Sequence, residues 1–193
     1  MDEILETWLG PGEVPDRERQ ARWWTKDPVF DEHLRACFGA LLERAAAGEL
    51  DDWAETARGA LALVILLDQL SRNVHRGTAR AFAQDARARE IMRRALERGL
   101  DRELPPMHRV FLLMPLMHSE ELEDQRESVA RFEALAEGAE GELGEALRNN
   151  ADFARRHLEI VERFGRYPHR NEVLGRASTP EEIAFLEEPG SSF

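Results

Sequence analysis

The sequence DPVFDEHLRACFGALLERAAAG, residues 27–48, decides the fold class of this chain. Asp27 is a typical N-cap, Pro28 suits the first helical position, and Gly48 is a typical helix terminator. Between them, apolar side chains recur at steps of three and four residues, as on one face of a helix: Phe30, Leu34, Cys37, Phe38, Leu41 and Leu42. The stretch therefore predicts one long helix whose apolar face, Cys37 included, is buried in a core.

The same signals predict helices along most of the chain, and no alternating run predicts a strand. Pro115 is expected to end or kink its helix because proline lacks an amide donor. The expected helices are 57–73, 78–98, 105–113, 119–137, 145–166 and a short one after the capping-box sequence Thr179–Glu182. Short connections favour antiparallel neighbours. We therefore predict an all-α fold, a single-domain antiparallel helical array over residues 1–193.

The composition excludes several classes of function. The 193 residues carry 38 acidic and 26 basic side chains and a net charge of −12, which argues against nucleic-acid and anionic-membrane partners. The apolar run 60–67 is too short to span a bilayer, and the acidic start lacks the features of a signal peptide. With a single cysteine, we expect a reduced, cytoplasmic protein without disulfides. No phosphate-binding glycine loop or dinucleotide motif is present, so we predict no cofactor and no metal.

Polar residues interrupt apolar sequence at three places, the first of which is 66–76. Four of its side chains fall on one helical face at steps of three and four residues: Gln69, Arg72, Asn73 and Arg76. Asp68 and Arg72 stand four residues apart and can pair along the helix. The pair can close a buried helix as a purely structural contact, or it can belong to a ligand site.

The second place is 114–125, where His118 and Glu120 follow Pro115, and Gln125 comes after them. An imidazole beside a carboxylate can act as a general acid–base pair. As a metal signal the spacing is weak, because it lacks two histidines one helical turn apart. The alternative interpretation is that Ser119 and Glu120 merely cap the first turn of the next helix.

The third place is the end of a long helix and the turn after it, residues 153–171. His157 shares an apolar stripe with Phe153, Ile160 and Phe164, so it is either a hydrogen-bonded core residue or a functional group facing inward. Gly165 is expected to end the helix. A constrained turn then carries Tyr167, His169, Arg170 and Asn171.

Arginines and histidines gather in these three segments: Arg72, Arg76, Arg163, Arg166 and Arg170 with His118, His157 and His169. The planar guanidinium group suits carboxylate and phosphate ligands. Convergence of the segments would form either a polar network that locks the helices together or a pocket for an anionic small molecule.

The three segments also identify a resemblance. LLDQLSRN (66–73) with Arg76, PLMHSE (115–120) with Gln125, and RFGRYPHRN (163–171) resemble the bacterial domain-of-unknown-function family 924. The resemblance covers nearly the whole chain, from Arg22-Trp23-Trp24 to Phe185-Leu186. It implies a tetratricopeptide-like right-handed superhelix and no particular activity. Ser71 and Val74 stand where that family more often has proline and a bulkier aliphatic residue.

Two hypotheses of function follow. In the first, the chain forms a pocket that binds or hydrolyses an anionic small molecule, of which phosphate-bearing molecules are one class. His118, Glu120 and His157 would be its catalytic groups, and its ligand-binding residues would be Asp68, Gln69, Arg72, Asn73, Arg76, Gln125, Arg163, Arg166, His169, Arg170 and Asn171. In the second, the chain is a peptide or protein interaction scaffold anchored by Trp8, Trp23, Trp24 and Trp53, and the polar clusters are structural.

Overall fold

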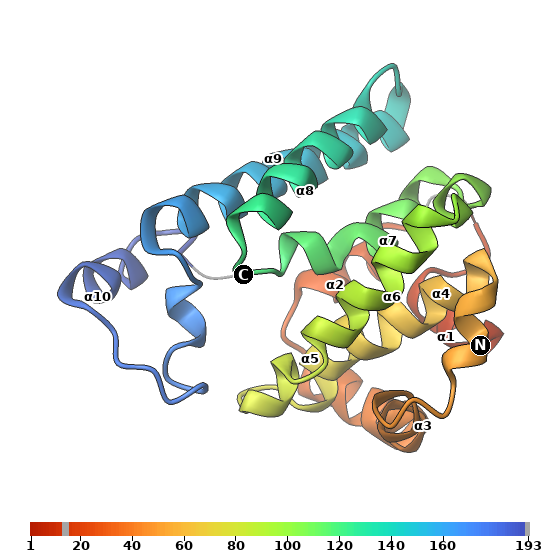
Figure 1. The fold of residues 1–193 in the computed structure, drawn as a ribbon, viewed down its shortest axis with the longest axis horizontal. Coiled ribbons are helices and arrows are strands. Elements are labelled where there is room, and N and C mark those ends of the chain that lie inside the picture. The colour runs from red at the N-terminus through yellow and green to blue at the C-terminus, as the bar shows by residue number, and fades with distance from the viewer. Residues whose placement is uncertain (13–15, 192–193) are drawn as a thin grey trace.

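The chain folds into helices packed in layers, as shown by a computed structural model that describes residues 1–12 and 16–191 (Figure 1). The described residues contain no strand, so the predicted all-α class is confirmed. The α-helices are α1 (Asp2–Trp8), α2 (Arg17–Trp24), α3 (Pro28–Ala46), α4 (Ala57–Val64), α5 (Ser71–Val74), α6 (Asp85–Glu97), α7 (Pro106–Met117), α8 (Leu122–Ala136), α9 (Gly141–Phe164) and α10 (Pro180–Leu186). A π-helix, η2 (Ile65–Leu70), joins α4 to α5, and short 3-10 turns are η1 (Asp51–Glu55), η3 (Ala79–Phe82), η4 (Leu100–Glu103) and η5 (Pro168–Arg170).

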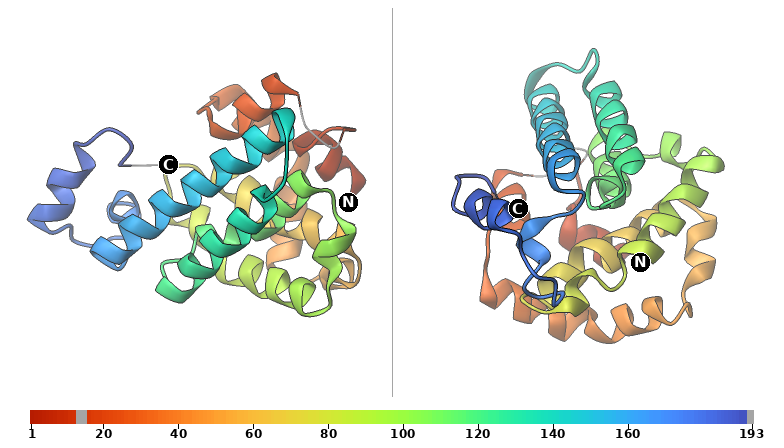
Figure 2. Two further views of the ribbon diagram at one scale, coloured as in Figure 1. Left: turned by 90° about the horizontal axis from the view of Figure 1, so that it is seen from above. Right: turned by 60° about the vertical axis from the view of Figure 1, so that its left-hand side comes forward.

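The segment formed by α4, η2 and α5 runs through the centre of the core. Every residue from 59 to 71 is buried, including the acidic residue Asp68. Helices α3, α6 and α7 pack around this segment, while α8 and α9 form an antiparallel hairpin against α7 (Figures 1 and 2). A smaller apolar cluster of Ile160, Val161, Tyr167 and Phe185 attaches α10 to the end of α9. The central segment therefore fixes the positions of its own polar residues precisely.

The capping signals at two helices are confirmed. The Asp27 carboxylate accepts hydrogen bonds from the backbone N–H groups of Val29 and Phe30 at the start of α3. At α10, Thr179 and Glu182 form the reciprocal capping box that the sequence predicted. Gly165 ends α9 with a φ of +66°, the left-handed conformation that glycine adopts without strain.

Three expected boundaries are wrong. α6 begins at Asp85 rather than after Thr78, because the Thr78 hydroxyl donates to the His75 carbonyl and a 3-10 turn intervenes. α7 continues through Pro115 to Met117, since one missing amide donor does not end a helix that is buried along its length. α9 starts at Gly141, earlier than the expected 145.

Two further expectations about individual side chains are wrong. Cys37 is exposed, because the buried face of α3 follows Leu34, Phe38 and Leu42 at four-residue steps and Cys37 lies beside it. Ser119 does not cap α8 directly; its hydroxyl accepts from the Glu121 N–H, one residue before the helix starts at Leu122.

No helix among the described residues is both long enough and apolar enough to cross a bilayer. The right-handed superhelical winding that the family resemblance implied stays a prediction.

Candidate functional site

The predicted polar segments border a pocket of about 490 Å³. Its walls come from five places in the chain: the end of α2, the η2–α5 segment with the residues after it, the end of α7, the middle of α9, and η5. The lining residues are Trp23, Trp24, Thr25, Gln69, Arg72, Asn73, Arg76, Gly77, Ala81, Phe82, Met114, Met117, His118, Asn150, Phe153, His157, His169 and Arg170. The structure therefore brings together eight of the predicted catalytic and ligand-binding residues, and with them the predicted anchors Trp23 and Trp24.

The π-helix η2 positions Asp68 behind the pocket lining, of which Asp68 itself is not a member. A π-helical turn accommodates an extra residue in a helix and is frequent at functional sites. The Asp68 carboxylate is fully buried, accepts a hydrogen bond from Gln69 Nε2 at 2.5 Å, and lies 3.1 Å from Nη1 of Arg72. The expected pairing of Asp68 with Arg72 is thus present, and it lies inside the protein.

His118, the residue that ends α7, contacts the same carboxylate. Its Nδ1 atom lies 2.8 Å from both Oδ1 and Oδ2 of Asp68. Burial and the neighbouring Arg72 cation lower the pKa of His118, although Asp68 opposes them. Burial alone would raise the pKa of Asp68, but Arg72 and His118 lower it overall. At neutral pH the pair is therefore an aspartate ion and a neutral imidazole that donates its Nδ1–H.

Arg72 extends the network from Asp68 to a second carboxylate. It donates two hydrogen bonds of 2.9 Å to the two oxygens of Asp85, which lies at the start of α6. Asp85 also faces Arg170, but the distance from its Oδ2 atom to Nη1 of Arg170 is 3.5 Å. One carboxylate therefore faces two arginines, and Arg72 makes much the better contact with it.

Arg170 is buried between two rings. Its guanidinium carbon lies 4.4 Å from the ring centre of Tyr167 and 4.7 Å from that of Phe82. Only 7% of the side chain is exposed, and its Nε has no hydrogen-bond partner among the described residues. Burial and Arg72 lower its pKa to about 10. Arg170 is thus a buried cation whose charge is poorly compensated.

The other two histidines predicted for the site, His157 and His169, lie beside His118 and Arg170. The His157 Nδ1 atom is 2.8 Å from the carbonyl oxygen of Phe153, and its ring centre is 6.4 Å from that of His118. Burial lowers the pKa of His157 to about 3. Burial and Arg170 lower that of His169 to about 4, and the buried Nδ1 atom of His169 has no partner within the described part of the chain. Both rings are neutral at pH 7.

Asn73 and Arg76 attach the pocket rim to α3. Asn73 Nδ2 donates to Asp31 Oδ1 at 2.7 Å, and Arg76 donates to both Asp31 oxygens at 2.6 and 3.0 Å. These contacts lower the pKa of Asp31 against the effect of its burial. Asp31 therefore neutralises Arg76, and this part of the rim is a compensated ion pair.

Aromatic side chains form the opposite wall. Trp24 stacks on Phe153 with ring centres 6.3 Å apart and planes 16° apart, and this contact joins α2 to α9. Trp23 packs edge-on against Phe111 in the core and donates its Nε1–H to the Trp8 carbonyl. Trp24 remains 59% exposed, so apolar ring surface is accessible at the pocket mouth.

Three sequence-predicted residues at the α7–α8 junction and η5 lie outside the pocket lining. Glu120 accepts from the Tyr167 N–H and from two nitrogens of Arg176, so it is engaged away from His118. Gln125 Nε2 contacts three backbone carbonyls and the Tyr167 hydroxyl. Asn171 donates to Ser178 and Glu182. These residues attach the C-terminal segment to the helices.

The other two predicted arginines also face α10. Arg163 pairs with Glu181 at 2.9 Å on the surface, and Arg166 contacts both carboxylate oxygens of Glu182 at 2.6 and 2.8 Å. Neither residue lines the pocket. The sequence also missed members of the site. Neither Phe82 nor Asp85 could be singled out, because no local pattern shows which distant arginine an aromatic ring or a carboxylate will contact.

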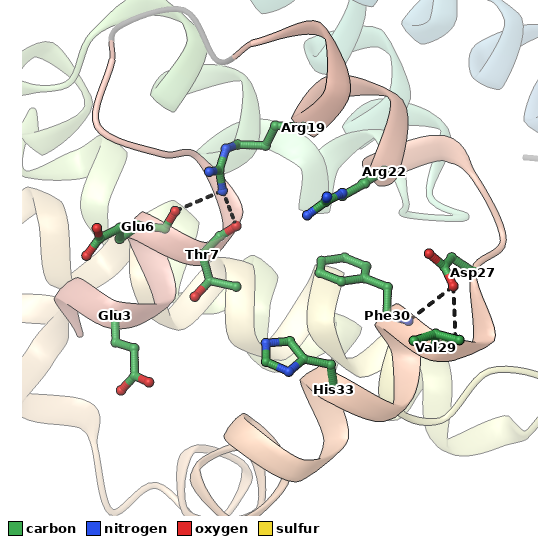
Figure 3. A pocket seen from close by; sticks show the side chains of 9 residues that line it. All are labelled: Glu3, Glu6, Thr7, Arg19, Arg22, Asp27, Val29, Phe30 and His33. Carbon is green, nitrogen blue, oxygen red and sulfur yellow. Dashed lines mark hydrogen bonds between the residues drawn. The ribbon is translucent and has the colours of Figure 1, made fainter.

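A second, wider hollow of about 680 Å³ lies between α1, α2 and α3 (Figure 3). Its lining mixes the exposed acids Glu3 and Glu6 with Arg19, whose guanidinium donates to the carbonyls of Glu6 and Thr7. None of the predicted site residues lines it. Over the described ranges 1–12 and 16–191, no group of three His, Cys, Asp or Glu side chains is arranged to hold a metal ion.

Comparisons with known proteins agree with the resemblance. A family model described as a bacterial protein of unknown function (DUF924) matches residues 4–190. Among solved structures, the chain is similar to a protein of unknown function from Agrobacterium tumefaciens, with 38% sequence identity, 96% coverage of each chain and a TM-score of 0.82. No match was found among functionally curated proteins.

Proposed function

The chain belongs to the DUF924 family, and we propose that its pocket binds a small organic anion with an apolar or aromatic part. The proposal is carried by Arg170. A buried charge without a good partner costs several kcal/mol, and a bound anion removes that cost. Arg170 is 7% exposed, its hydrogen bond to Asp85 is 3.5 Å long, and its Nε has no hydrogen-bond partner within the described part of the chain.

The charge of the lining supports an anion over a cation. The described residues that line the pocket include Arg72, Arg76 and Arg170 and no aspartate or glutamate. Asp68 and Asp85 lie behind this surface, where they hold Arg72 in position. A carboxylate or phosphate group at Arg170 can accept from its remaining donors and from His169 when that ring presents an N–H.

The rest of the lining supports an apolar part on the same ligand. Trp23, Trp24, Phe82, Met114, Met117 and Phe153 surround the cationic end. A volume of about 490 Å³ falls in the range of ordinary small-molecule sites. The ligand class is therefore an amphiphilic anion, such as an aromatic carboxylate or an aryl phosphate.

The test is the melting temperature of the purified protein with four probes: benzoate, phenylphosphonate, inorganic phosphate and benzyl alcohol. Saturating benzoate or phenylphosphonate should raise it by several degrees, since ligand at about 100 times Kd adds about 2.7 kcal/mol of stability. Phosphate should act more weakly and benzyl alcohol least. Equal melting temperatures with all four probes and without ligand would refute the proposal.

A further inference from the structure

His118 presents its Nδ1 atom to Asp68 and is one of the residues that line the pocket. Because the carboxylate accepts from Nδ1, the proton of the neutral imidazole lies on Nδ1 and Nε2 carries a lone pair. Nε2 lies on the ring edge opposite the Asp68 contact. Asp68 cannot turn away, since it is fully buried and is also held by Gln69 and Arg72. The imidazole is thus fixed in one orientation and one tautomer.

We propose that His118 is a general base with which this pocket hydrolyses carboxylic esters that carry an aromatic group and a negative charge. The inference rests on the proposed function, because Arg170 holds the negative charge of the ester. None of the described lining residues is Ser, Cys, Asp or Glu, and the hydroxyl of the lining residue Thr25 donates to the Ala21 carbonyl. Water is therefore the nucleophile in this assignment, and His118 activates it in a single addition step.

The step balances without any further reactant. The water oxygen forms a bond to the ester carbonyl carbon while one water proton moves to Nε2 of His118. The bond between that carbon and the alcohol oxygen then breaks, and the alcohol oxygen takes the proton from Nε2. The products are a carboxylic acid and an alcohol or phenol, and His118 returns to its neutral form.

Asp68 acts through His118 and is a positioning residue. Its negative charge stabilises the imidazolium that forms transiently, and its contact holds the Nδ1–H tautomer. The groups that face His118 are Asp68 and Arg72 of the central segment, Asp85 of α6, His157 of α9 and His169 of η5. Burial and Arg72 lower the pKa of His118, so the base is unprotonated at neutral pH.

The experiment uses 4-acetoxybenzoate as the charged ester and phenyl acetate as its neutral counterpart. The wild-type protein should hydrolyse the charged ester with the higher kcat/KM. His118→Gln should lower kcat by about 100-fold or more, the usual contribution of a general base, while benzoate binding persists. His33→Gln removes an exposed histidine outside this pocket and should leave the rate unchanged.

The experiment distinguishes a failure of the binding proposal from a failure of the catalytic proposal. If benzoate binds but the wild-type protein adds nothing to the spontaneous hydrolysis, the catalytic inference is wrong and the proposed function stands. If benzoate does not bind, the proposed function itself fails. Equal kcat values for the wild-type protein and His118→Gln would also overturn the assignment.

If His118→Gln does not fold, the pH profile of ester hydrolysis by the wild-type protein still tests the role of His118. The rate should rise with pH, level off, and have its midpoint below the ordinary histidine pKa of about 6.5. Asp68→Asn should move that midpoint to lower pH, because it removes the charge that raises the His118 pKa. A rate that grows in proportion to hydroxide at every pH, or an unmoved midpoint in Asp68→Asn, contradicts the roles given to these two residues.

Discussion

The Nδ1 atom of His118 lies 2.8 Å from each carboxylate oxygen of Asp68, and this contact joins the end of α7 to the π-helix in the core. Arg72 contacts the same carboxylate from one helical turn away. Three ionisable groups are therefore packed together around one carboxylate, that of Asp68, which is fully buried. Such a network holds α7 against the π-helix and also determines the protonation state of His118 in the pocket.

Asp68→Asn should destabilise the protein strongly, because it removes one of the two carboxylates that pair with the Arg72 cation and leaves Asp85 as the other. Removing one member of a buried ion pair typically costs about 3 kcal/mol or more. Urea unfolding followed by circular dichroism measures the loss. The control is Asp52→Asn, which changes an exposed carboxylate and should stay within about 0.5 kcal/mol of the wild type. A similarly small effect for Asp68→Asn would show that the network contributes little to stability.

Acid should destabilise the fold through His157. Its folded-state pKa of about 3 lies below the ordinary value near 6.5, so the unfolded chain binds more protons between these two pH values. The free energy of unfolding therefore falls as pH drops through this window, by at most about 1.4 kcal/mol per pH unit for one such group. Between pH 6.5 and pH 5, His157→Gln should lose about 1.6 kcal/mol less than the wild type.

Urea titrations at several pH values measure this slope. His33→Gln is the matched control, because it removes an exposed histidine and should follow the wild-type slope. Parallel slopes for His157→Gln and the wild type would mean that His157 takes up its proton in the folded protein as easily as in the unfolded chain.

The Tyr167 hydroxyl should contribute more to the free energy of unfolding than a surface hydroxyl does. It donates to the Met117 carbonyl at 2.5 Å and accepts from Gln125 Nε2 at 2.7 Å, all in buried positions. Tyr167→Phe leaves those groups with fewer partners and should cost about 1–3 kcal/mol. Thr78→Val removes an exposed hydroxyl that also donates to a carbonyl, and it should cost much less. Equal melting temperatures of the two variants would refute the ranking.

Cys37 should react with a thiol reagent in the folded protein. Its side chain is exposed on α3, with the His33 ring nitrogens 3.8 Å from its sulfur. One equivalent of thiol should therefore be modified without denaturant, at a rate that low concentrations of urea do not change. A reaction that requires unfolding would place Cys37 in the core, as the sequence pattern suggested.

The sequence predicts the helices of this fold better than it predicts their edges. Capping residues act over three or four positions, so Asp27 and Thr179 were read correctly from local sequence alone. The boundary at Thr78 and the continuation of α7 through Pro115 depend on burial and on competing local hydrogen bonds. Cys37 is another example, because a wide apolar stripe on a helix does not reveal which of its two edges is buried against the core.

The candidate site was predicted in part for a physical reason. Gln69, Arg72 and His118 interrupt strongly apolar sequence, and a polar group inside a core needs partners, so their convergence could be expected. The pairing of His118 with Asp68 rather than with Glu120 could not, because it joins residues 50 positions apart. The role of Asp85 could not be expected either, because its partner Arg170 lies 85 positions away in the sequence.

The central claim is that Arg170 receives the negative charge of a ligand, and a calorimetric titration with phenylphosphonate tests it most directly. Arg170→Gln should raise Kd at least tenfold, which corresponds to about 1.4 kcal/mol. Arg163→Gln removes an arginine that pairs with Glu181 outside the pocket, and it should leave Kd within about twofold of the wild type. Unchanged binding by Arg170→Gln, or equal losses in both variants, would contradict the account.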